Sequence, residues 1–487
     1  MSLPLDTPTI IEVTHVLIVV TIALRVIMRR PARGIAMAWL LLVSLFPFAG
    51  ALTYLLVGER RISRNRARRL DNLRLEYRNI ASAALQGGIT HVDWSLHAPA
   101  ARSMDKLGRR LLGSPTVRGS RLELFHDTQA ILKAIARDVD AAQTSVLMEF
   151  YIWNAGGAAD EVLDAILRAA HRGVRCRILI DALGARQWWQ GKQPGQLRAA
   201  GVELRAALPA GVFHTLIGRT DLRMHRKVAI LDGKLAWTGS MNLVDPRYFK
   251  QERGFGEWVD AMVRIEGAAV LPLSATLIGD WLLESGESTQ ELIDSIKEPR
   301  EAPPGTADVQ VIPSGPGLSE DGLLQMLLAL INAAQEELIL TTPYLVPDDA
   351  MILALRGASS RGVKVIIIVP EKVDSFLTRY ASRSYYDDLL DAGVQIHLFY
   401  GGLLHTKSIL VDGALSMFGT VNLDMRSLWL NYELALFVYD PEFGQTLRSL
   451  QQDYLEQSRR LDATIWAARA FKGRLLENAL RVASPLL

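Results

Sequence analysis

Two stretches of the chain place histidine, lysine, aspartate, a hydroxyl residue and asparagine at identical spacing. The first reads HRKVAILDGKLAWTGSMN and the second reads HTKSILVDGALSMFGTVN, so both follow the pattern H-x-K-x4-D-x6-G-[ST]-x-N. Chance rarely produces two such matches in one chain, and we predict a single active site assembled from both copies. The candidate residues are His225, Lys227, Asp232, Ser240 and Asn242 in the first copy, and His405, Lys407, Asp412, Thr420 and Asn422 in the second.

The residue types in this pattern suit a phosphodiester substrate. Lysine neutralises the phosphate charge, and hydroxyl and amide groups bind its non-bridging oxygens. One histidine can attack phosphorus and form a covalent phosphohistidine, while the other protonates the leaving alcohol and then deprotonates the incoming one. The symmetry of the motifs leaves these roles open between His225 and His405. Because the lysines supply the charge that a metal would bring, we expect neither a metal ion nor another cofactor.

Each motif must be held by a strand and a turn. Histidine and lysine two residues apart on a strand point to the same face, and the following Asp-Gly predicts a two-residue hairpin turn. Such a turn at Asp232–Gly233 places Ser240 opposite His225, and a slip of one residue places Asn242 there. The aspartate has two interpretations, a catalytic carboxylate or a turn former. The equivalent residues of the second copy are His405, Asp412, Thr420 and Asn422.

A nucleophilic imidazole must be neutral and correctly oriented, usually by a carboxylate on its second nitrogen. Asp260 (in EWVDAMVRIEG) and Glu433 (in NYELALFVYD) occupy corresponding strands downstream of the two motifs. We predict that they orient the histidines, the alternative being exposed strand carboxylates. Tyr151 and Tyr344 hold corresponding places after the first strand of each half, where core residues are more usual than substrate contacts.

The chain around the motifs is itself repeated. DVDAAQTSVLMEFYIW leads through a helical run to RGVRCRILID, and LINAAQEELILTTPYLV leads in the same way to RGVKVIIIVP. Apolar runs rich in β-branched residues that alternate with helical patterns predict an α/β fold of βα repeats on mixed sheets. We place the first half at 116–300 and the second at 301–487, with the boundary at the linker-like stretch Glu301–Gly305.

The first sixty residues differ from the rest of the chain. Two apolar runs, Ile10–Met28 and Gly34–Gly58, predict a membrane hairpin over 1–58, followed by a basic linker over 59–115. The second run carries no charge and is expected to be the stronger span, because Glu12, His15 and Arg25 interrupt the first. A cleavable signal peptide is disfavoured, since no positive charge precedes the first run.

Arginines near these runs predict their orientation. The larger cluster follows the second run and should stay in the cytoplasm, which places the amino terminus and the catalytic domain there. The same cluster can hold anionic headgroups or serve only as a stop-transfer signal. The smaller cluster is Arg29, Arg30 and Arg33, and the larger one is Arg60, Arg61, Arg64, Arg66, Arg68 and Arg69.

Composition narrows the classes of function. The net charge of +2 over 487 residues argues against a strongly basic nucleic-acid binder. A single cysteine, Cys176, excludes a disulfide framework and a multi-thiolate metal site. The tail from Thr464 to Leu487 mixes aromatic and aliphatic residues with arginine and lysine. As a helix it would either lie on a membrane surface or pack on the core of its own domain.

The paired motifs resemble the HKD motifs of the phospholipase D superfamily. The two-run anchor, the segment GSMNLVDPRYFK and the ending RLLENALRVASPLL further resemble bacterial cardiolipin synthases. The resemblance implies a pseudo-twofold catalytic domain in the bacterial cytoplasmic membrane, crossed more than once by the anchor. It also implies phosphatidylglycerol as both donor and acceptor, with release of glycerol and a phosphatidyl-histidine intermediate. By analogy His225 is the nucleophile and His405 the general acid and base, and a homodimer is left open.

Three alternatives use the same residues differently. A membrane phospholipase D, or another phosphatidyltransferase, would pass the phosphatidyl group to water or to another alcohol, because acceptor choice depends on pocket shape. A nuclease of the same superfamily would need a basic groove lined by aromatic residues, which the near-neutral charge disfavours. A non-catalytic lipid-binding scaffold is disfavoured because both motifs are complete.

Overall fold

The structure is a computed structural model that describes residues 7–29, 33–58, 66, 68–70, 90–209, 221–249, 254–287, 305–319 and 321–482. The chain forms two compact units, Met1–Asn65 with Ala210–Asp221, and Arg66–Pro209 with Leu222–Leu487. Three arginines of the predicted basic cluster (Arg60, Arg61 and Arg64) and most of the predicted boundary stretch, 301–304, lie outside the described residues.

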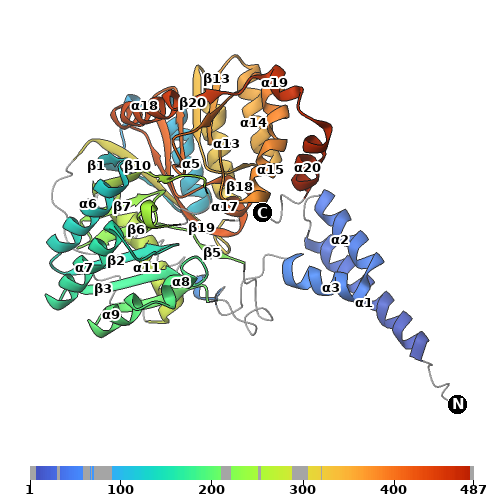
Figure 1. Cartoon of the computed structure of the whole chain (residues 1–487), viewed down its shortest axis with the longest axis horizontal. Helices are drawn as coiled ribbons and strands as arrows, with labels where there is room; N and C mark the ends of the chain where they lie inside the picture. Colours follow the sequence, from blue (N-terminus) through green and yellow to red (C-terminus); the bar gives the residue numbers. More distant parts are fainter. Residues whose placement is uncertain are drawn as a thin grey trace. The chain divides into compact units, whose positions relative to one another are not determined.

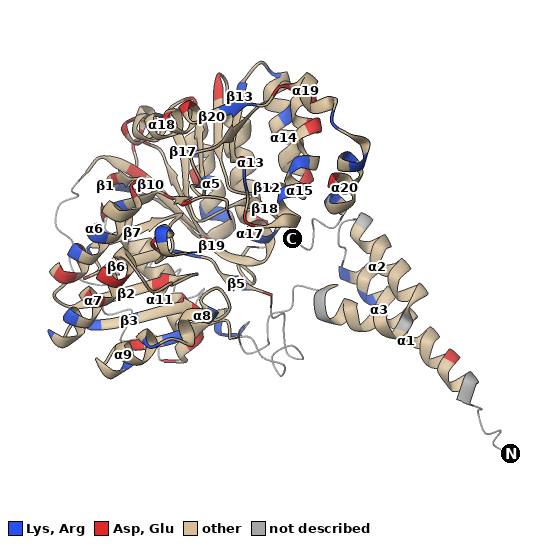
Figure 2. Ribbon diagram, in the orientation of Figure 1, with Lys and Arg blue, Asp and Glu red and all other residues tan. Residues whose placement is uncertain are grey.

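The first unit contains the apolar helices. Helix α1 (Thr7–Arg29) includes a 21-residue stretch, Thr9–Arg29, with mean hydropathy 2.2, which is long and apolar enough to cross a bilayer. Figure 2 shows these helices almost entirely without charged side chains. The second run is divided into α2 (Arg33–Leu45), α3 (Pro47–Thr53) and a π-helical turn, Tyr54–Gly58. Pro47 lacks a backbone N–H, so the break falls there. The prediction that the second run is the stronger span is therefore wrong.

In the second unit, the 3-10 helix η2 (Trp94–Leu96) and α5 (Pro99–Leu112) precede two βα repeats (Figure 1). The first repeat consists of β1 (Thr116–Phe125), α6 (Thr128–Ala141), β2 (Ser145–Phe150), α7 (Ala158–His171), β3 (Arg175–Asp181), α8 (Arg186–Trp189), α9 (Gln193–Ala199), β4 (Glu203–Ala207), β5 (Arg223–Met224), β6 (Val228–Leu231), β7 (Leu235–Gly239), β8 (Trp258–Val259), β9 (Met262–Gly267) and α11 (Val270–Ser285).

The second repeat has matching elements. It consists of β10 (Ala307–Ser314), α13 (Gly322–Ala333), β11 (Glu337–Thr341), β12 (Leu345–Val346), α14 (Asp349–Ser360), β13 (Lys364–Pro370), α15 (Phe376–Ser384), α16 (Tyr386–Asp391), β14 (Gln395–Phe399), β15 (Leu403–Leu404), β16 (Ser408–Val411), β17 (Leu415–Gly419), β18 (Leu423–Asp424), α17 (Met425–Trp429), β19 (Asn431–Val438), α18 (Pro441–Glu456), β20 (Ser458–Arg460), α19 (Ala463–Ala467) and α20 (Phe471–Val482).

Strand order shows the internal symmetry. The strands run β20-β14-β13-β11-β16-β17-β19-β10-β1-β9-β7-β6-β2-β3-β4. Outward from the β10–β1 junction, β19-β17-β16-β11-β13-β14 on one side matches β9-β7-β6-β2-β3-β4 on the other. The outer strands β2-β3-β4 and β11-β13-β14 are parallel, and the inner ones are antiparallel. The predicted mixed α/β fold with two matching repeats is confirmed.

The two repeats share one core. A buried cluster joins Val228 and Val263 of the first repeat to Ile366 and Leu436 of the second, together with side chains of α11 and α18. Separate clusters lie between each half-sheet and its own outer helices. Because the inner strands of both repeats pack into the same core, the motif at the start of β6 and the motif at the start of β16 are held in a fixed relation.

Candidate active site

Each histidine is attached to the opposite half of the catalytic unit. His225 lies between β5 and β6, and its backbone N–H donates to the carbonyl of Tyr432 at 2.9 Å. His405 lies between β15 and β16, and its backbone N–H donates to the carbonyl of Val259 at 2.8 Å. Both side chains are buried. The repeats are therefore joined at the residues that carry the predicted chemistry.

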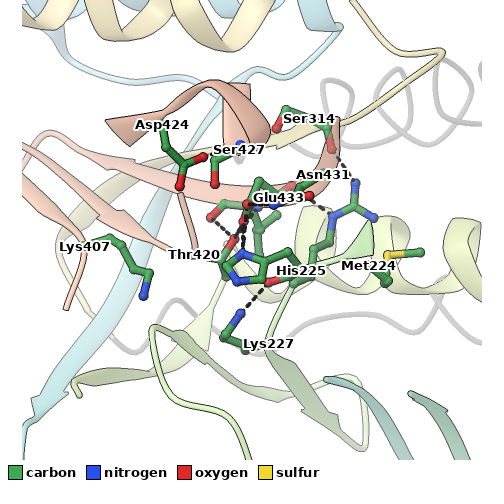
Figure 3. A network of polar contacts seen from close by, with 12 residues as sticks. Met224, His225, Lys227, Ser314, Lys407, Thr420, Asp424, Ser427, Asn431 and Glu433 are labelled. Carbon is green, nitrogen blue, oxygen red and sulfur yellow. Dashed lines mark hydrogen bonds and ion pairs between the residues drawn. The ribbon is translucent and has the colours of Figure 1, made fainter. Parts of the chain in front are cut away.

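The orienting carboxylates also cross between the halves. The Nδ1 atom of His225 lies 2.8 and 2.9 Å from the two carboxylate oxygens of Glu433, as Figure 3 shows. The Nδ1 atom of His405 lies 2.7 Å from Oδ1 of Asp260. An ionised carboxylate only accepts hydrogen bonds, so Nδ1 of each ring carries the proton and the Nε2 lone pair is left for chemistry. The structure places both predicted carboxylates against histidines, each against the histidine of the other half.

Electrostatics keep these pairs in a useful protonation state. Burial lowers the pKa of His225 to about 4, against the opposing effect of Glu433, and burial also lowers the pKa of His405. Burial alone would raise the pKa of Glu433 and Asp260, but the neighbouring histidine, which donates a hydrogen bond to each carboxylate, and the lysine charges lower both below their usual range. At neutral pH the imidazoles are therefore neutral and the carboxylates ionised, as a nucleophile and a general base require.

Ser240 and Thr420 bind the carboxylates. The Ser240 hydroxyl donates to Asp260 at 2.5 Å and accepts from the backbone N–H of Ala261 at 3.0 Å. The Thr420 hydroxyl donates to Glu433 at 2.5 Å in the same way. These hydroxyls were expected to bind substrate phosphate. In the structure they instead donate to the carboxylates that orient the imidazole rings.

The hairpin after each histidine is longer than predicted. Val228 pairs with Thr238 and Leu231 with Leu235, so three residues, 232–234, form the connection. The predicted two-residue turn is wrong, because Lys234 lies between the paired strands together with Asp232 and Gly233. Continuing this register places Met241 opposite His225, with Ser240 and Asn242 on either side. The second hairpin has the same register.

The two asparagines differ in their contacts. Oδ1 of Asn242 accepts from the backbone N–H of Ile152 at 3.0 Å, which fixes the loop after β2. Oδ1 of Asn422 is buried and has no hydrogen-bond partner in the part of the chain that the structure describes. A buried amide without a partner costs free energy, so Asn422 is the better placed of the two to bind an incoming ligand.

Both motif lysines are fully buried beside the histidines. The ammonium group of Lys227 donates to the carbonyl of His225 at 2.7 Å, and that of Lys407 to the carbonyl of His405 at 2.5 Å. Burial lowers the pKa of Lys227 to about 8 and that of Lys407 to about 7. An ammonium has three donors, so each lysine keeps donors for a phosphate. Within the described residues no three His, Cys, Asp or Glu side chains form a metal-binding group.

Asp232 and Asp412 lie at the other end of the hairpins. The Asp232 carboxylate accepts from the backbone N–H groups of Gln143, Thr144 and Ser145, each at 2.8 Å. Asp412 accepts from the equivalent backbone N–H groups 335–337. Burial would raise the pKa of Asp232, but these hydrogen bonds lower it. The contacts agree with the turn-former interpretation and join neither aspartate to a histidine.

An Asp232→Ala substitution should therefore reduce stability and spare catalysis. It removes three backbone hydrogen bonds and one from the Thr144 hydroxyl to a charged acceptor, and we expect a loss of about 2 kcal/mol in the free energy of unfolding. Thermal unfolding and lipid turnover, both measured on the detergent-solubilised protein, check this. A large loss of turnover in a variant whose melting temperature is unchanged would support the catalytic interpretation instead.

Three further side chains complete the surroundings, and the sequence did not single them out as functional. The Tyr151 ring lies 5.0 Å from the His225 ring, and the Trp258 ring stacks on His405 with centroids 4.5 Å apart. Arg226 lies within the first motif and is buried. Its guanidinium donates to the carbonyl of Glu433 at 3.0 Å and forms an ion pair with Asp280. From the sequence, the alternation of side chains along a strand indicates only that Arg226 points to the face opposite His225 and Lys227.

Removing Arg226 should destabilise the junction between the halves. Arg226→Met leaves Asp280 as an unpaired buried charge, which costs about 3–5 kcal/mol. The Arg226→Met/Asp280→Leu double variant should recover most of that loss, because neither charge then remains buried. Melting temperatures of the two single variants and the double variant form the double-mutant cycle that checks this. Strictly additive losses would show that the pair is not coupled.

A cavity of about 780 Å³ opens beside Trp258. Loops of both repeats line it, including Arg247 and Phe255 from the first and Lys372 and Tyr400 from the second. The lining combines aromatic rings with side chains of both charges, and it lies next to the residue that stacks on His405.

The comparisons with known proteins agree with this geometry. Residues 135–263 and 327–454 match the family described as "Cardiolipin synthase, PLD-like domain", and residues 17–59 match "Phospholipase_D-nuclease N-terminal". The chain is 42% identical over 473 residues to Cardiolipin synthase A of Serratia proteamaculans (strain 568), covering 97% of this chain and 96% of that protein. It is also 42% identical over 475 residues to Cardiolipin synthase A of Erwinia tasmaniensis, with the same coverage.

A solved structure supports the fold. The phosphatidylserine synthase of Haemophilus influenzae Rd KW20 superposes with a TM-score of 0.60 at 16% identity, covering 79% of this chain and 99% of that one. At this identity the likeness concerns architecture alone. Together with the paired motifs and the near full-length identity, it shows that the chain belongs to the bacterial cardiolipin synthase family of the phospholipase D superfamily.

Proposed function

We propose that the protein transfers a phosphatidyl group from one phosphatidylglycerol to a second and releases glycerol, so that cardiolipin is formed. The observation that carries this proposal is the crossed arrangement of two neutral imidazoles, each oriented by a carboxylate of the other half, beside two buried lysines. The names of the 42% identical relatives supply the substrate class.

The reaction divides into two steps. Nε2 of His225 attacks phosphorus, and the bond from phosphorus to the glycerol oxygen breaks. The negative charge of the bound phosphodiester raises the pKa of His405, and the imidazolium form of His405 gives its Nε2 proton to that oxygen. His405 then removes the proton from a primary hydroxyl of the second lipid, whose oxygen attacks phosphorus and breaks the phosphorus–nitrogen bond. Lys227 and Lys407 stabilise the charge on the phosphoryl oxygens in both steps. Assigning attack to His225 rests on the family resemblance.

The proposed setting is the bacterial cytoplasmic membrane. The apolar helix α1 and the family relationship indicate membrane association. The larger arginine cluster after the second apolar run supports a catalytic unit on the cytoplasmic side and an anchor that crosses more than once. Labelling of introduced cysteines in intact and opened spheroplasts determines on which side of the membrane the catalytic unit lies. Light scattering of the solubilised protein reads whether it is a homodimer.

Product analysis tests the proposed function. Purified protein is incubated with phosphatidylglycerol, and the lipids are resolved by mass spectrometry. Cardiolipin with an equal amount of glycerol is the expected result. Phosphatidic acid as the main product would instead establish a membrane phospholipase D that uses water as acceptor, and unchanged phosphatidylglycerol would refute both reactions.

A further inference from the structure

The last helix of the catalytic unit, α20, exposes large apolar side chains and buries a carboxylate. On α20, Glu477 is 1% exposed, whereas Phe471 is 74%, Leu475 58% and Val482 84% exposed. A surface helix of a soluble protein normally does the opposite, because burying apolar side chains stabilises it. Exposed apolar side chains opposite a buried carboxylate indicate that this side of α20 suits surroundings other than water.

Ionic contacts fix the orientation of α20. Glu477 accepts from Arg383 of α15 at 2.7 Å and from Arg469 at 2.9 Å, and Arg481 pairs with Asp388 at 2.7 Å. Trp466, just before α20, is buried and lies between the guanidinium groups of Arg383 and Arg469. One face of the tail therefore packs on its own domain, as one of the two alternatives expected. These contacts prevent the helix from turning its apolar side inward.

The exposed face has a defined pattern. Phe471, Leu475 and Val482 are four and seven residues apart, which places them on one stripe of the helix. Lys472 and Arg474 flank the stripe on its two sides and are exposed. Helix α15, on which α20 packs, adds Phe376 (62% exposed) and Leu377 (46% exposed) at its start. An apolar stripe between cationic side chains is typical of helices that lie in the headgroup region of anionic membranes.

We propose that the exposed face formed by Phe471, Leu475 and Val482 of α20, with Phe376 and Leu377 of α15, inserts into the surface of an anionic bilayer. The flanking Lys472 and Arg474 bind lipid phosphates there. Helix α15 begins two residues after Asp374, which accepts from the hydroxyl of Tyr344 at 2.6 Å. That tyrosine is the counterpart of Tyr151, which contacts His225, so the inserted face is continuous along the chain with the surroundings of the site.

A second copy of the chain fits this face less well. A stable protein interface removes about 800 Å² from each partner, and the five apolar side chains of this face fall well short of that. Cationic residues of one sign at its rim would also repel their copies across a twofold contact. Insertion of this face is a separate property from the proposed lipid transfer. It rests on the proposed function only for the expectation that the lipid is anionic.

Cysteine labelling in the full chain tests the proposal. The single native cysteine, Cys176, is buried with a pKa raised by burial to about 11, so it does not react with labels. An environment-sensitive fluorophore is attached to Phe471→Cys, Leu475→Cys or Val482→Cys, and to Gln452→Cys on the exposed side of α18 as control. Each protein is reconstituted into vesicles of phosphatidylglycerol and phosphatidylcholine with a quencher on the acyl chains.

The expected result is a blue shift and strong loss of fluorescence at the three α20 positions, with neither change at the control. Equal quenching at all four positions, or none at α20, would overturn the insertion. Disulfide formation between unlabelled Phe471→Cys chains, together with no quenching of the labelled protein, would assign the face to a dimer instead. Quenching unchanged in phosphatidylcholine alone would overturn the role of Lys472 and Arg474. A His225→Ala background separates the two proposals, because insertion should persist when lipid transfer is lost.

Discussion

Replacing either motif histidine by alanine should abolish cardiolipin formation, with a loss of about 10⁴-fold or more in turnover. His225→Ala removes the nucleophile, so no covalent lipid adduct should form with labelled phosphatidylglycerol. His405→Ala removes the proton donor and acceptor, so a phosphatidyl-enzyme should form slowly and then persist, because the second alcohol is not deprotonated. Intact-protein mass spectrometry after a neutral quench, run beside product analysis, measures both effects.

The adduct also decides which histidine attacks. An adduct on His225→Ala and none on His405→Ala would exchange the two roles and leave the mechanism otherwise intact. Full activity in either variant would remove the two-histidine mechanism altogether. His397 provides a control, because it is a histidine of the same catalytic unit on β14, outside the motifs. The His397→Ala variant should retain its turnover. Its melting temperature shows whether the loss of a histidine outside the motifs unfolds the catalytic unit.

Catalysis should decline in alkaline solution because the two lysines lose their charge. Burial lowers the pKa of Lys407 to about 7 and that of Lys227 to about 8, so the ammonium form is lost as pH rises through this range. The kcat/KM profile, which reports the free enzyme, should therefore fall above neutral pH. It should also fall in acid near pH 4, where His225 becomes protonated and cannot attack. A bound phosphodiester raises both lysine pKa values, so the kcat profile should extend further into alkali.

Two substitutions at Lys407 separate charge from structure. Lys407→Met removes the charge and should lower kcat/KM by about 10²–10³-fold. Lys407→Arg keeps a charge that does not titrate, so the alkaline limb should move toward the pKa of Lys227 even if the rate itself falls. A wild-type profile that stays level from neutral pH to well above pH 8 would contradict the assignment of charge neutralisation to these lysines.

The sequence predicted the chemistry of the site better than its spatial connections. Two identical motifs identified the histidines and lysines, and matching strand positions identified Asp260 and Glu433. The crossing of these carboxylates between halves was not predictable, because it depends on the junction of β1 with β10 and on the core that both repeats share. The same limit applies to Trp258, which reaches His405 from the other repeat through the pairing of β8 with β15.

Local predictions were wrong where one residue changes the geometry. Asp-Gly indicated a two-residue turn, but the connection has three residues, and the carboxylate of Asp232 binds three backbone N–H groups of another segment. Composition ranked the second apolar run above the first, yet Pro47 breaks it while Glu12 and Arg25 do not interrupt α1. In both cases the hydrogen bonds that individual residues make or cannot make, at Asp232 and at Pro47, matter more than the average composition of the segment.

The crossed pairs also determine when, during synthesis, the protein becomes a catalyst. A growing chain releases His225, Lys227 and Asp260 long before Glu433 has been translated. Until then His225 has no carboxylate to hold its ring, and Asp260 has no His405 to hold. An incomplete chain is thus unable to attack the lipids of the membrane in which it is being assembled. The chain becomes catalytically active only when the second repeat has been synthesised and has packed against the first.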